Sequence, residues 1–532
     1  MNPWAPRLTA WLAPLLAAVA VWSATASLRH ALEAIDYPFQ LDPIESKILQ
    51  SALWIQRGEP LYRGLGEEPP WVVANYTPLY PWLCSLGISE RLPTLCWPRA
   101  LSLAGAVLSG LALGALLWRG THSWSLALLA PALWWSSYEV FMWTPYARVD
   151  LLALALSALA LTWASFCLGR WTWPRVLGVS ALFCLAWLTR QSQVLLPAAL
   201  VTWLLVTDRT WAWRLAAIWG GGVALLAAML TLVTGGRFWT LTVTYNVNLW
   251  SRDQMLIWVN HLLAFWPPLP WMLALGALGV GLQRRGREGR LSAGAEITGL
   301  LTCAAGWNTA NVVATGKAGA ALNYLLEPLW CLLGLVTVLW FQLAAGTCGA
   351  PECRPNGRSS ILRALVFGLF TGLFTLLTLT AATSRIPGAP VREGLWPHRS
   401  LWRSPISDHE RRRDLEIESA FRSAEGPVLA EYGIYALRTG HDLVWEPFLL
   451  SQLTMEGRWD EAPLLERVRR GDFALILLRD DVANSDAFDF SVTPAFAGAL
   501  RSAYVEARFW PGTIPLHLWR PRGLTAASPA SE

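Results

Sequence analysis

About eleven apolar segments divide the first 383 residues, and each approaches the roughly 20 residues that a helix needs to cross a bilayer. They cover residues 8–28, 99–118, 123–142, 150–168, 173–189, 193–207, 214–234, 256–282, 294–314, 324–345 and 361–383. The segments at 173–189 and 193–207 are short and adjacent, so they could form a tight hairpin or a re-entrant pair. The pattern predicts an all-α polytopic membrane protein, because only closed backbone hydrogen bonding is tolerated in lipid.

The composition agrees with lipid as the surrounding solvent. Of the 532 residues, 54% are hydrophobic and 15% are charged, whereas a soluble domain usually carries about 25% charge. The net charge of +5 is small and scattered, which argues against nucleic acid as a partner. The lipid bilayer is the expected partner instead.

The first apolar segment and the loop charges predict an orientation. Arg7 precedes an apolar run that could imitate a signal peptide, but the run is long enough to span and no clear cleavage site follows. Lys and Arg are more numerous in the short loops on the N-terminal side, most densely at Arg284, Arg285, Arg287 and Arg290. Positive loops usually stay inside, so we expect a cytoplasmic N-terminus, an extracytoplasmic tail and a place in the cell (inner) membrane.

Two long segments are too polar to span. Residues 29–98 form the predicted first outer loop of a transmembrane domain over 1–383, with a helical stretch at 45–57. Residues 384–413 are rich in Arg, Pro and Ser and are interpreted as a linker. Residues 414–532 are expected to fold as a small extracytoplasmic α/β domain. Its predicted strands lie at 428–430, 473–478 and 516–519, and its predicted helices at 460–470 and 494–504.

Ionisable residues near the predicted outer ends of the spans are the functional candidates, because a charge at a membrane boundary is costly. The acids are Asp42, Glu45, Asp150 and Glu327, and the polar or basic residues are Arg148, Arg190, Gln191, Lys317, Tyr62, Tyr76 and Tyr324. Each has an ordinary alternative. Asp42 and Glu45 could cap a helix that starts near Pro43, and Asp150 could favour a helix N-terminus. Arg148 and Arg190 could be anchors that reach the headgroups, and Tyr62 and Tyr76 could be interfacial aromatics.

Taken together, these residues suit group transfer from a phosphate-activated lipid. A carboxylate can act as general base toward a hydroxyl. A cation can stabilise a phosphate as negative charge develops on it.

Two motifs in the outer loop carry a family resemblance. Residues 52–62 read Ala-Leu-Trp-Ile-Gln-Arg-Gly-Glu-Pro-Leu-Tyr, and residues 75–81 read Asn-Tyr-Thr-Pro-Leu-Tyr-Pro, shortly after an acidic residue that follows the first span. This order resembles the first outer loop of GT-C fold glycosyltransferases, in particular the bacterial branch similar to protein O-mannosyltransferases and the lipid A aminoarabinose transferase (glycosyltransferase family 39-like). The resemblance covers about residues 1–330.

The resemblance implies an inverting transfer from a polyprenyl-phosphate sugar to an acceptor outside the cytoplasm. The family usually shows an acidic pair, often Asp-Glu, on the first outer loop. Asp42 matches the first position, but Pro43 breaks the pair, so Glu45 is a candidate for the second carboxylate or for the base itself. Asp150 resembles a second acidic residue of the family.

These implications give a mechanistic hypothesis with open alternatives. Asp42 would deprotonate the acceptor, Asp150 would orient the base or the sugar, and a cation would hold the departing phosphate. That cation would be Lys317, Arg190 or Arg148, while Tyr62 and Tyr76 could line the sugar pocket. No obligatory cofactor or metal is expected, although a divalent ion could bind the carboxylates. A transporter or lipid flippase, and a non-catalytic scaffold of the same fold, are the competing interpretations.

Overall fold

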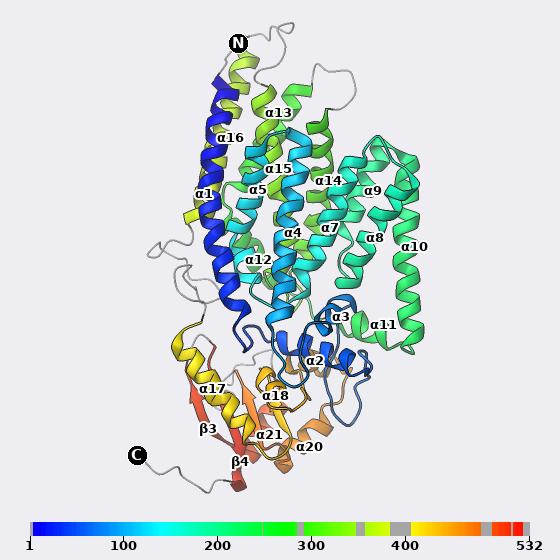
Figure 1. The fold of residues 1–532 in the computed structure, drawn as a ribbon, viewed down its shortest axis with the longest axis vertical. Helices are drawn as coiled ribbons and strands as arrows, with labels where there is room; N and C mark the ends of the chain where they lie inside the picture. Colours follow the sequence, from blue (N-terminus) through cyan, green and yellow to red (C-terminus); the bar gives the residue numbers. More distant parts are fainter. Residues whose placement is uncertain are drawn as a thin grey trace.

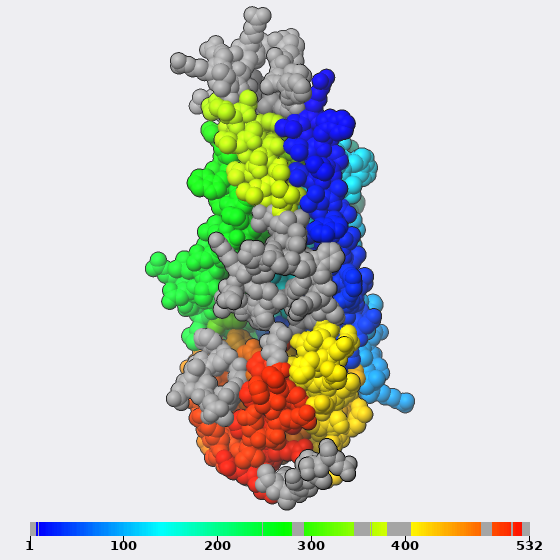
Figure 2. All heavy atoms as spheres, turned by 90° about the vertical axis from the view of Figure 1, so that its left-hand side faces the viewer, coloured from blue at the N-terminus to red at the C-terminus, as the bar shows by residue number. Residues whose placement is uncertain are grey.

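The computed structural model describes residues 4–246, 248–284, 292–346, 357–383, 406–479, 492–511 and 514–524. A long helical body carries a small sheet domain at one end, and the N-terminal end of helix α1 lies at the other (Figure 1). Figure 2 shows this end-to-end arrangement on one face, with α17 in yellow and strands β3 and β4 in red at the base. The predicted opposition of N-terminus and C-terminal domain agrees with this placement, although the orientation in a membrane stays a prediction.

Among the described residues, five helices are long and apolar enough to cross a membrane unaided. They belong to α1 (Trp4–Ile35), α4 (Cys96–Thr121), α7 (Val149–Cys167), α10 (Arg209–Val233) and α15 (Asn323–Gly346). Shorter apolar helices are α8 (Trp173–Thr189), α9 (Leu195–Thr207) and part of α16 (Gly357–Thr383). The helices α5 (Trp124–Ser136), α6 (Tyr138–Trp143) and α14 (Ala293–Ala314) complete this part of the body. The lengths and apolar composition of these helices agree with a multi-pass membrane fold, but they do not confirm eleven spans.

Two predicted spans are interrupted. The segment expected at 256–282 consists of α12 (Arg252–Phe265) and α13 (Leu269–Arg284), bent by 75°. Pro267 and Pro268 lie between them and lack the backbone N–H that a continuous helix would use. The segment expected at 123–142 divides into α5 and α6 at Ser137, whose backbone is extended.

The short helices α8 and α9 do not form the simple hairpin considered from the sequence. Helix α8 packs on α7 and α10, whereas α9 packs on α14, α10 and α7. Each therefore contacts these neighbours more extensively than it contacts the other.

Of the arginines used for the orientation, Arg285, Arg287 and Arg290 lie outside the described residues.

The outer loop contains the predicted helix and a second, shorter one. Helix α2 (Glu45–Gln56) confirms the expected helical stretch, and α3 (Leu79–Ser85) follows it. On the same side of the body, α11 (Arg237–Thr242) and the 3-10 turn Thr244–Asn246 follow α10.

The C-terminal domain holds a four-stranded sheet in the order β1-β2-β4-β3. Strands β1 (Val428–Ala430) and β2 (Leu475–Leu478) are parallel, while β4 (Leu516–Pro521) is antiparallel to β2 and to β3 (Tyr504–Trp510). Its helices are α17 (Asp408–Arg422), α18 (Ile434–Arg438), α19 (Pro447–Met455), α20 (Ala462–Arg470) and α21 (Pro494–Ala503), with a final 3-10 turn at Arg522–Leu524.

Three predicted strands and two predicted helices of this domain are confirmed. Strand β3 was not predicted, since its middle residues are charged or exposed and give no apolar run. Residues 384–405 of the predicted linker lie outside the described residues, so the domain boundaries stay a prediction.

The sheet domain is joined to the outer loop by backbone hydrogen bonds. The N–H of Trp71 donates to the carbonyl of Val444 (2.7 Å), and the N–H of Glu446 donates to the carbonyl of Trp71 (3.1 Å). The side-chain oxygens of Gln40 and Gln50 also accept backbone N–H groups of the domain, from Ile434 and Leu443. These bonds fix the domain against the loop that follows α1.

Close packing of α4 on α7 sets the position of the first turn of α7, where Asp150 lies. Gly105 allows this approach, because a Cβ atom there would lie 2.5 Å from the backbone of Leu151. The N-terminal end of α7 is thereby held close to α4.

We expect Gly105→Ala to destabilise the protein by about 1–3 kcal/mol, since the added methyl group meets backbone that cannot move aside. The measurement is thermal unfolding in detergent. Gly368→Ala in α16 is the matched control, because no atom lies within 4 Å of the added Cβ there. Equal unfolding temperatures for the two variants would contradict close packing at Gly105.

Candidate functional site

A cavity of about 560 Å³ lies between the outer loop, the adjoining helix ends and the sheet domain. Seven residues predicted from the sequence line it: Asp42, Tyr76, Arg148, Arg190, Gln191, Lys317 and Tyr324. Asp150 lies directly behind this wall, because its carboxylate contacts Arg190 and Asn323, which both line the cavity. The structure thus brings together residues from four distant parts of the sequence.

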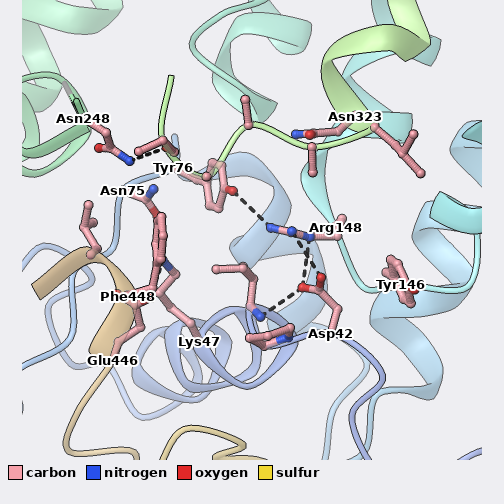
Figure 3. Close-up of a pocket in the computed structure, with 18 of the residues that line it drawn as sticks. Asp42, Lys47, Asn75, Tyr76, Tyr146, Arg148, Asn248, Asn323, Glu446 and Phe448 are labelled. Carbon is pink, nitrogen blue, oxygen red and sulfur yellow. Dashed lines mark hydrogen bonds and ion pairs between the residues drawn. The ribbon is translucent and has the colours of Figure 1, made fainter. Parts of the chain in front are cut away.

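Asp42 and Arg148 form a largely buried ion pair at the cavity wall (Figure 3). Asp42 Oδ1 lies 3.1 Å from Arg148 Nε, and Arg148 Nη2 donates to Oδ2 at 3.3 Å. Asp42 Oδ1 also accepts the N–H of Ile44 (3.0 Å), so the capping interpretation holds beside the ion pair. Burial raises the pKa of Asp42 above its ordinary value, Arg148 opposes that rise and the nearby Glu45 adds to it.

Asp150 and Arg190 form a second buried pair. Asp150 Oδ1 lies 3.0 Å from Arg190 Nη1 and accepts from Asn323 Nδ2 at 2.9 Å. The indole N–H of Trp143 donates to Asp150 Oδ2 at 2.9 Å. Neither Arg148 nor Arg190 extends outward as an anchor to headgroups, because both are held by carboxylates inside the protein.

Aromatic rings connect the two pairs. Arg148 lies over the ring of Trp143, with its guanidinium carbon 4.8 Å from the centroid, and donates a long hydrogen bond to Tyr76 Oη (3.5 Å). Arg190 lies 5.1 Å from the centroid of Tyr324. Burial raises the pKa of Tyr76 to about 12, so its hydroxyl stays protonated and available to a ligand.

Lys317 lies on the segment between α14 and α15. Its Nζ donates to Asn246 Oδ1 at 2.9 Å, and its backbone carbonyl accepts from Gln254 Nε2 at 2.7 Å. Burial, together with the neighbouring cations Arg190 and Lys47, lowers the pKa of Lys317 to about 8. Among the described residues, no carboxylate contacts the Lys317 ammonium, and the cavity that it lines also contains other cations.

Glu45 is not placed at the cavity, although the sequence made it a candidate base. Its carboxylate is fully buried and paired with Arg99, from Oε1 to Nε (2.8 Å) and from Oε2 to Nη2 (2.9 Å). It also accepts the backbone N–H groups of Leu41, Asp42 and Ala147. A carboxylate so fully occupied has no lone pair left for a substrate proton, so its position indicates a structural role.

Three other predicted residues also lie elsewhere or act locally. Tyr62 lines a separate, largely apolar hollow of about 640 Å³, and its hydroxyl donates to the carbonyl of Tyr76 (3.0 Å). Glu327 is buried in α15, where Asn308 Nδ2 donates to it at 3.3 Å. Gln191 lines the cavity and donates to the carbonyls of Asn75 (2.8 Å) and Thr242 (3.1 Å), which ties two loops together.

Sequence reasoning missed several residues of this site. Lys47 in α2 and Glu446 before α19 line the cavity and approach each other to 3.8 Å. The opposite charges of these two residues gave no signal, since nearly four hundred positions separate them in the sequence. The role of Arg99 behind the cavity was also missed, because a basic residue at the start of an apolar segment is common at a membrane boundary.

The carboxylates considered for a metal do not form one ligand set. Asp42, Glu45 and Asp150 each pair with a different arginine. Over the part of the chain that the structure describes, no group of three or more His, Cys, Asp and Glu side chains is arranged to hold a metal ion. Independence from metal stays a prediction.

The helical body, the helical outer loop and the appended sheet domain define a membrane protein of the GT-C fold, as the sequence resemblance predicted. ArnT, the aminoarabinose transferase of Cupriavidus metallidurans, shares this fold in its apo state, with a TM-score of 0.55 and 13% identity. The alignment covers 98% of this chain and 100% of ArnT.

ArnT bound to undecaprenyl phosphate gives a TM-score of 0.54 at the same identity and coverage. An oligosaccharyltransferase of Archaeoglobus fulgidus aligns at 11% identity over 87% of this chain and 69% of its own, with a TM-score of 0.47. No protein-family model matches the chain, and no curated protein matches it significantly.

We expect Arg99→Met to destabilise the protein by about 3–5 kcal/mol, because it leaves the Glu45 carboxylate buried without its partner. Thermal unfolding in detergent measures the loss. Arg29→Met is the control, since Arg29 forms an exposed pair with Glu33, and such pairs contribute about 0–1 kcal/mol. An Arg99 variant as stable as the Arg29 variant would show that the buried pair does not hold these segments together.

Proposed function

We propose that the protein is a membrane glycosyltransferase that transfers a sugar, with inversion, from a polyprenyl-phosphate donor to an extracytoplasmic acceptor. One observation carries the proposal. Two largely buried carboxylate–arginine pairs and the half-buried Lys317 meet at one cavity, at the end of a bundle of apolar helices. A lipid-linked phosphate needs both an apolar place for its chain and cations for its headgroup.

The fold supports the donor class. ArnT, which shares the fold, has been solved with undecaprenyl phosphate, a polyprenyl phosphate. The cations of the cavity lie between the ends of apolar helices and the polar outer loop, which supports a lipid-linked phosphate as the ligand.

Asp42 is the proposed general base. Its carboxylate lines the cavity, and its raised pKa makes it a stronger proton acceptor than an ordinary aspartate. The acceptor hydroxyl gives its proton to Asp42 while its oxygen bonds to the anomeric carbon. The bond from that carbon to the phosphate oxygen breaks on the opposite face, and the electron pair leaves with the phosphate.

The proposed role of the cations is to receive that phosphate. Lys317, Arg190 and Arg148 all line the cavity. Asp150 acts as a positioning residue in this proposal, because its oxygens are occupied by Arg190, Asn323 and Trp143. Cations fixed before reaction stabilise developing charge without reorganisation.

The competing interpretations are less favoured. A transporter commonly places its polar residues near the middle of the bilayer, between repeated helix groups. Here the charges of the cavity gather beside the long outer loop and the ends of the helices. A non-catalytic scaffold would have no need to keep a carboxylate with a raised pKa open to a cavity.

Asp42→Asn should lower sugar transfer by about 10²–10⁴-fold, because the amide cannot accept the proton. The assay follows release of labelled sugar from a panel of polyprenyl-phosphate donors to membrane acceptors. Asp36→Asn is the matched control, since Asp36 lies on the same outer loop but is exposed and outside the cavity. Full activity of a folded Asp42 variant would remove Asp42 as the base, and no transfer by the wild type from any donor would refute the proposed function.

The Lys317 ammonium should give the reaction an upper pH limit. Since its pKa is lowered to about 8, the charged form is present below that pH and is lost above it. We expect kcat/KM for the donor to be several-fold lower at about pH 9 than at about pH 7. In Lys317→Arg this decline should disappear, because a guanidinium stays charged, while Lys317→Met should be weak throughout. An unchanged decline in the arginine variant would show that another group titrates.

A further inference from the structure

Five acceptor oxygens in the cavity wall are buried without a hydrogen-bond partner. They are the side-chain oxygens Asn75 Oδ1, Gln191 Oε1, Asn248 Oδ1, Asn323 Oδ1 and Glu446 Oε2. Buried polar atoms are almost always satisfied, because an unpaired one costs free energy. So many acceptors around one cavity indicate a ligand that brings several hydrogen-bond donors, which is the chemistry of a sugar.

Glu446 differs from the other four in carrying charge and in coming from the sheet domain. It directly precedes α19, and its backbone N–H is bonded to the carbonyl of Trp71, so the residue is fixed on the outer loop. Its Oε1 lies 3.8 Å from Lys47 Nζ, whereas Oε2 has no partner. One oxygen therefore faces a cation and the other remains for a donor group.

The segment that carries Lys317 lies against the same helix. Gly319 has a φ of +80°, and a Cβ atom there would lie 2.7 Å from the ring of Phe448 in α19. This contact holds the segment that carries Lys317 beside Phe448, two residues after Glu446. Figure 3 shows Glu446, Phe448, Asn75 and Asn248 together at this cavity, which Lys317 also lines. A sugar attached to a phosphate at Lys317 would therefore lie near these four residues.

We propose that Glu446 determines specificity for the donor sugar, with Oε2 accepting a hydrogen bond from a hydroxyl or amine of the sugar ring. The inference rests on the proposed function and deepens it, since it makes the C-terminal domain part of the donor site. The sheet domain thus recognises the sugar, while the helical domain holds the phosphate and the base.

A purely electrostatic role for Glu446, as counter-ion to the buried Lys47, is the rival explanation. Two features favour sugar recognition. The separation of 3.8 Å is long for an ion pair, in which direct bonds are about 2.7–2.9 Å. In addition, a counter-ion alone does not account for the four unpaired amide oxygens around the same cavity.

The test measures the affinity of the purified full-length protein for undecaprenyl phosphate alone and for undecaprenyl phosphate carrying glucose, mannose, galactose or arabinose. We expect at least one of the sugar lipids to bind the wild type more tightly than undecaprenyl phosphate alone. In Glu446→Gln the ratio of the affinity for that sugar lipid to the affinity for bare undecaprenyl phosphate should fall by about tenfold, as expected for the loss of one charged hydrogen bond. The affinity for the bare lipid should not change.

Two further variants keep the test decisive. Glu418→Gln is the matched control, since Glu418 is a buried, ion-paired carboxylate of the same domain outside the cavity, and it should keep the full gain. The double variant Lys47→Met with Glu446→Gln removes both charges, and the sugar-dependent gain should stay lost. Recovery of the gain in the double variant would overturn the proposal in favour of the counter-ion role.

Other outcomes would also overturn the inference. They are an unchanged gain in Glu446→Gln, an equal loss for bare and sugar-bearing lipid, or no wild-type gain for any sugar. These results differ from failure of the proposed function, which is the absence of transfer from every donor. Transfer by the wild type together with an unaffected Glu446 variant would leave the glycosyltransferase in place and remove only this residue from the sugar site.

Discussion

The buried bond between Glu45 and Arg99 is the constraint on which the rest of the site depends. Arg99, in the first turn of α4, donates to Glu45 and to the backbone carbonyls of Ala34, Tyr37 and Phe39. Glu45 in turn accepts from the N–H of Ala147, just before α7. One pair of side chains therefore gathers the ends of α1, α2, α4 and α7. Because an unpaired charge is so costly there, this arrangement has few alternatives.

Asp42 and Arg148 obtain their positions from this junction. Asp42 lies three residues before Glu45, and Arg148 follows Ala147, so both are carried to the cavity by backbone that the buried pair holds. Asp150 likewise orients Arg190, which lines the cavity, from directly behind the cavity wall. Asp42, Arg148, Asp150 and Arg190 are each oriented by an oppositely charged partner. Lys317 is instead held by the uncharged Asn246 and through its own backbone carbonyl.

The sheet domain completes the cavity. Glu431 and Arg479 directly follow the parallel strands β1 and β2, and both line the cavity, as do residues at the start of α19. The carboxyl ends of parallel strands are common ligand sites, and here they face the helical body. Backbone bonds from Trp71 make the outer loop a bridge between the two parts, so the cavity requires both.

The sequence by itself determined the membrane character, the helical outer loop, most elements of the C-terminal domain and the fold relationship. Each of these follows from local periodicity or a short motif. The sequence also selected Asp42, Asp150, Arg148, Arg190 and Lys317, because charge beside an apolar run is visible locally. Only the tertiary structure decided which carboxylate pairs with which cation. It also showed that Glu45 lies outside the cavity and that Lys47 and Glu446 line it. Pairing between residues hundreds of positions apart depends on which helices pack together. Local periodicity shows which face of a helix is buried, but it does not show which other segment covers that face.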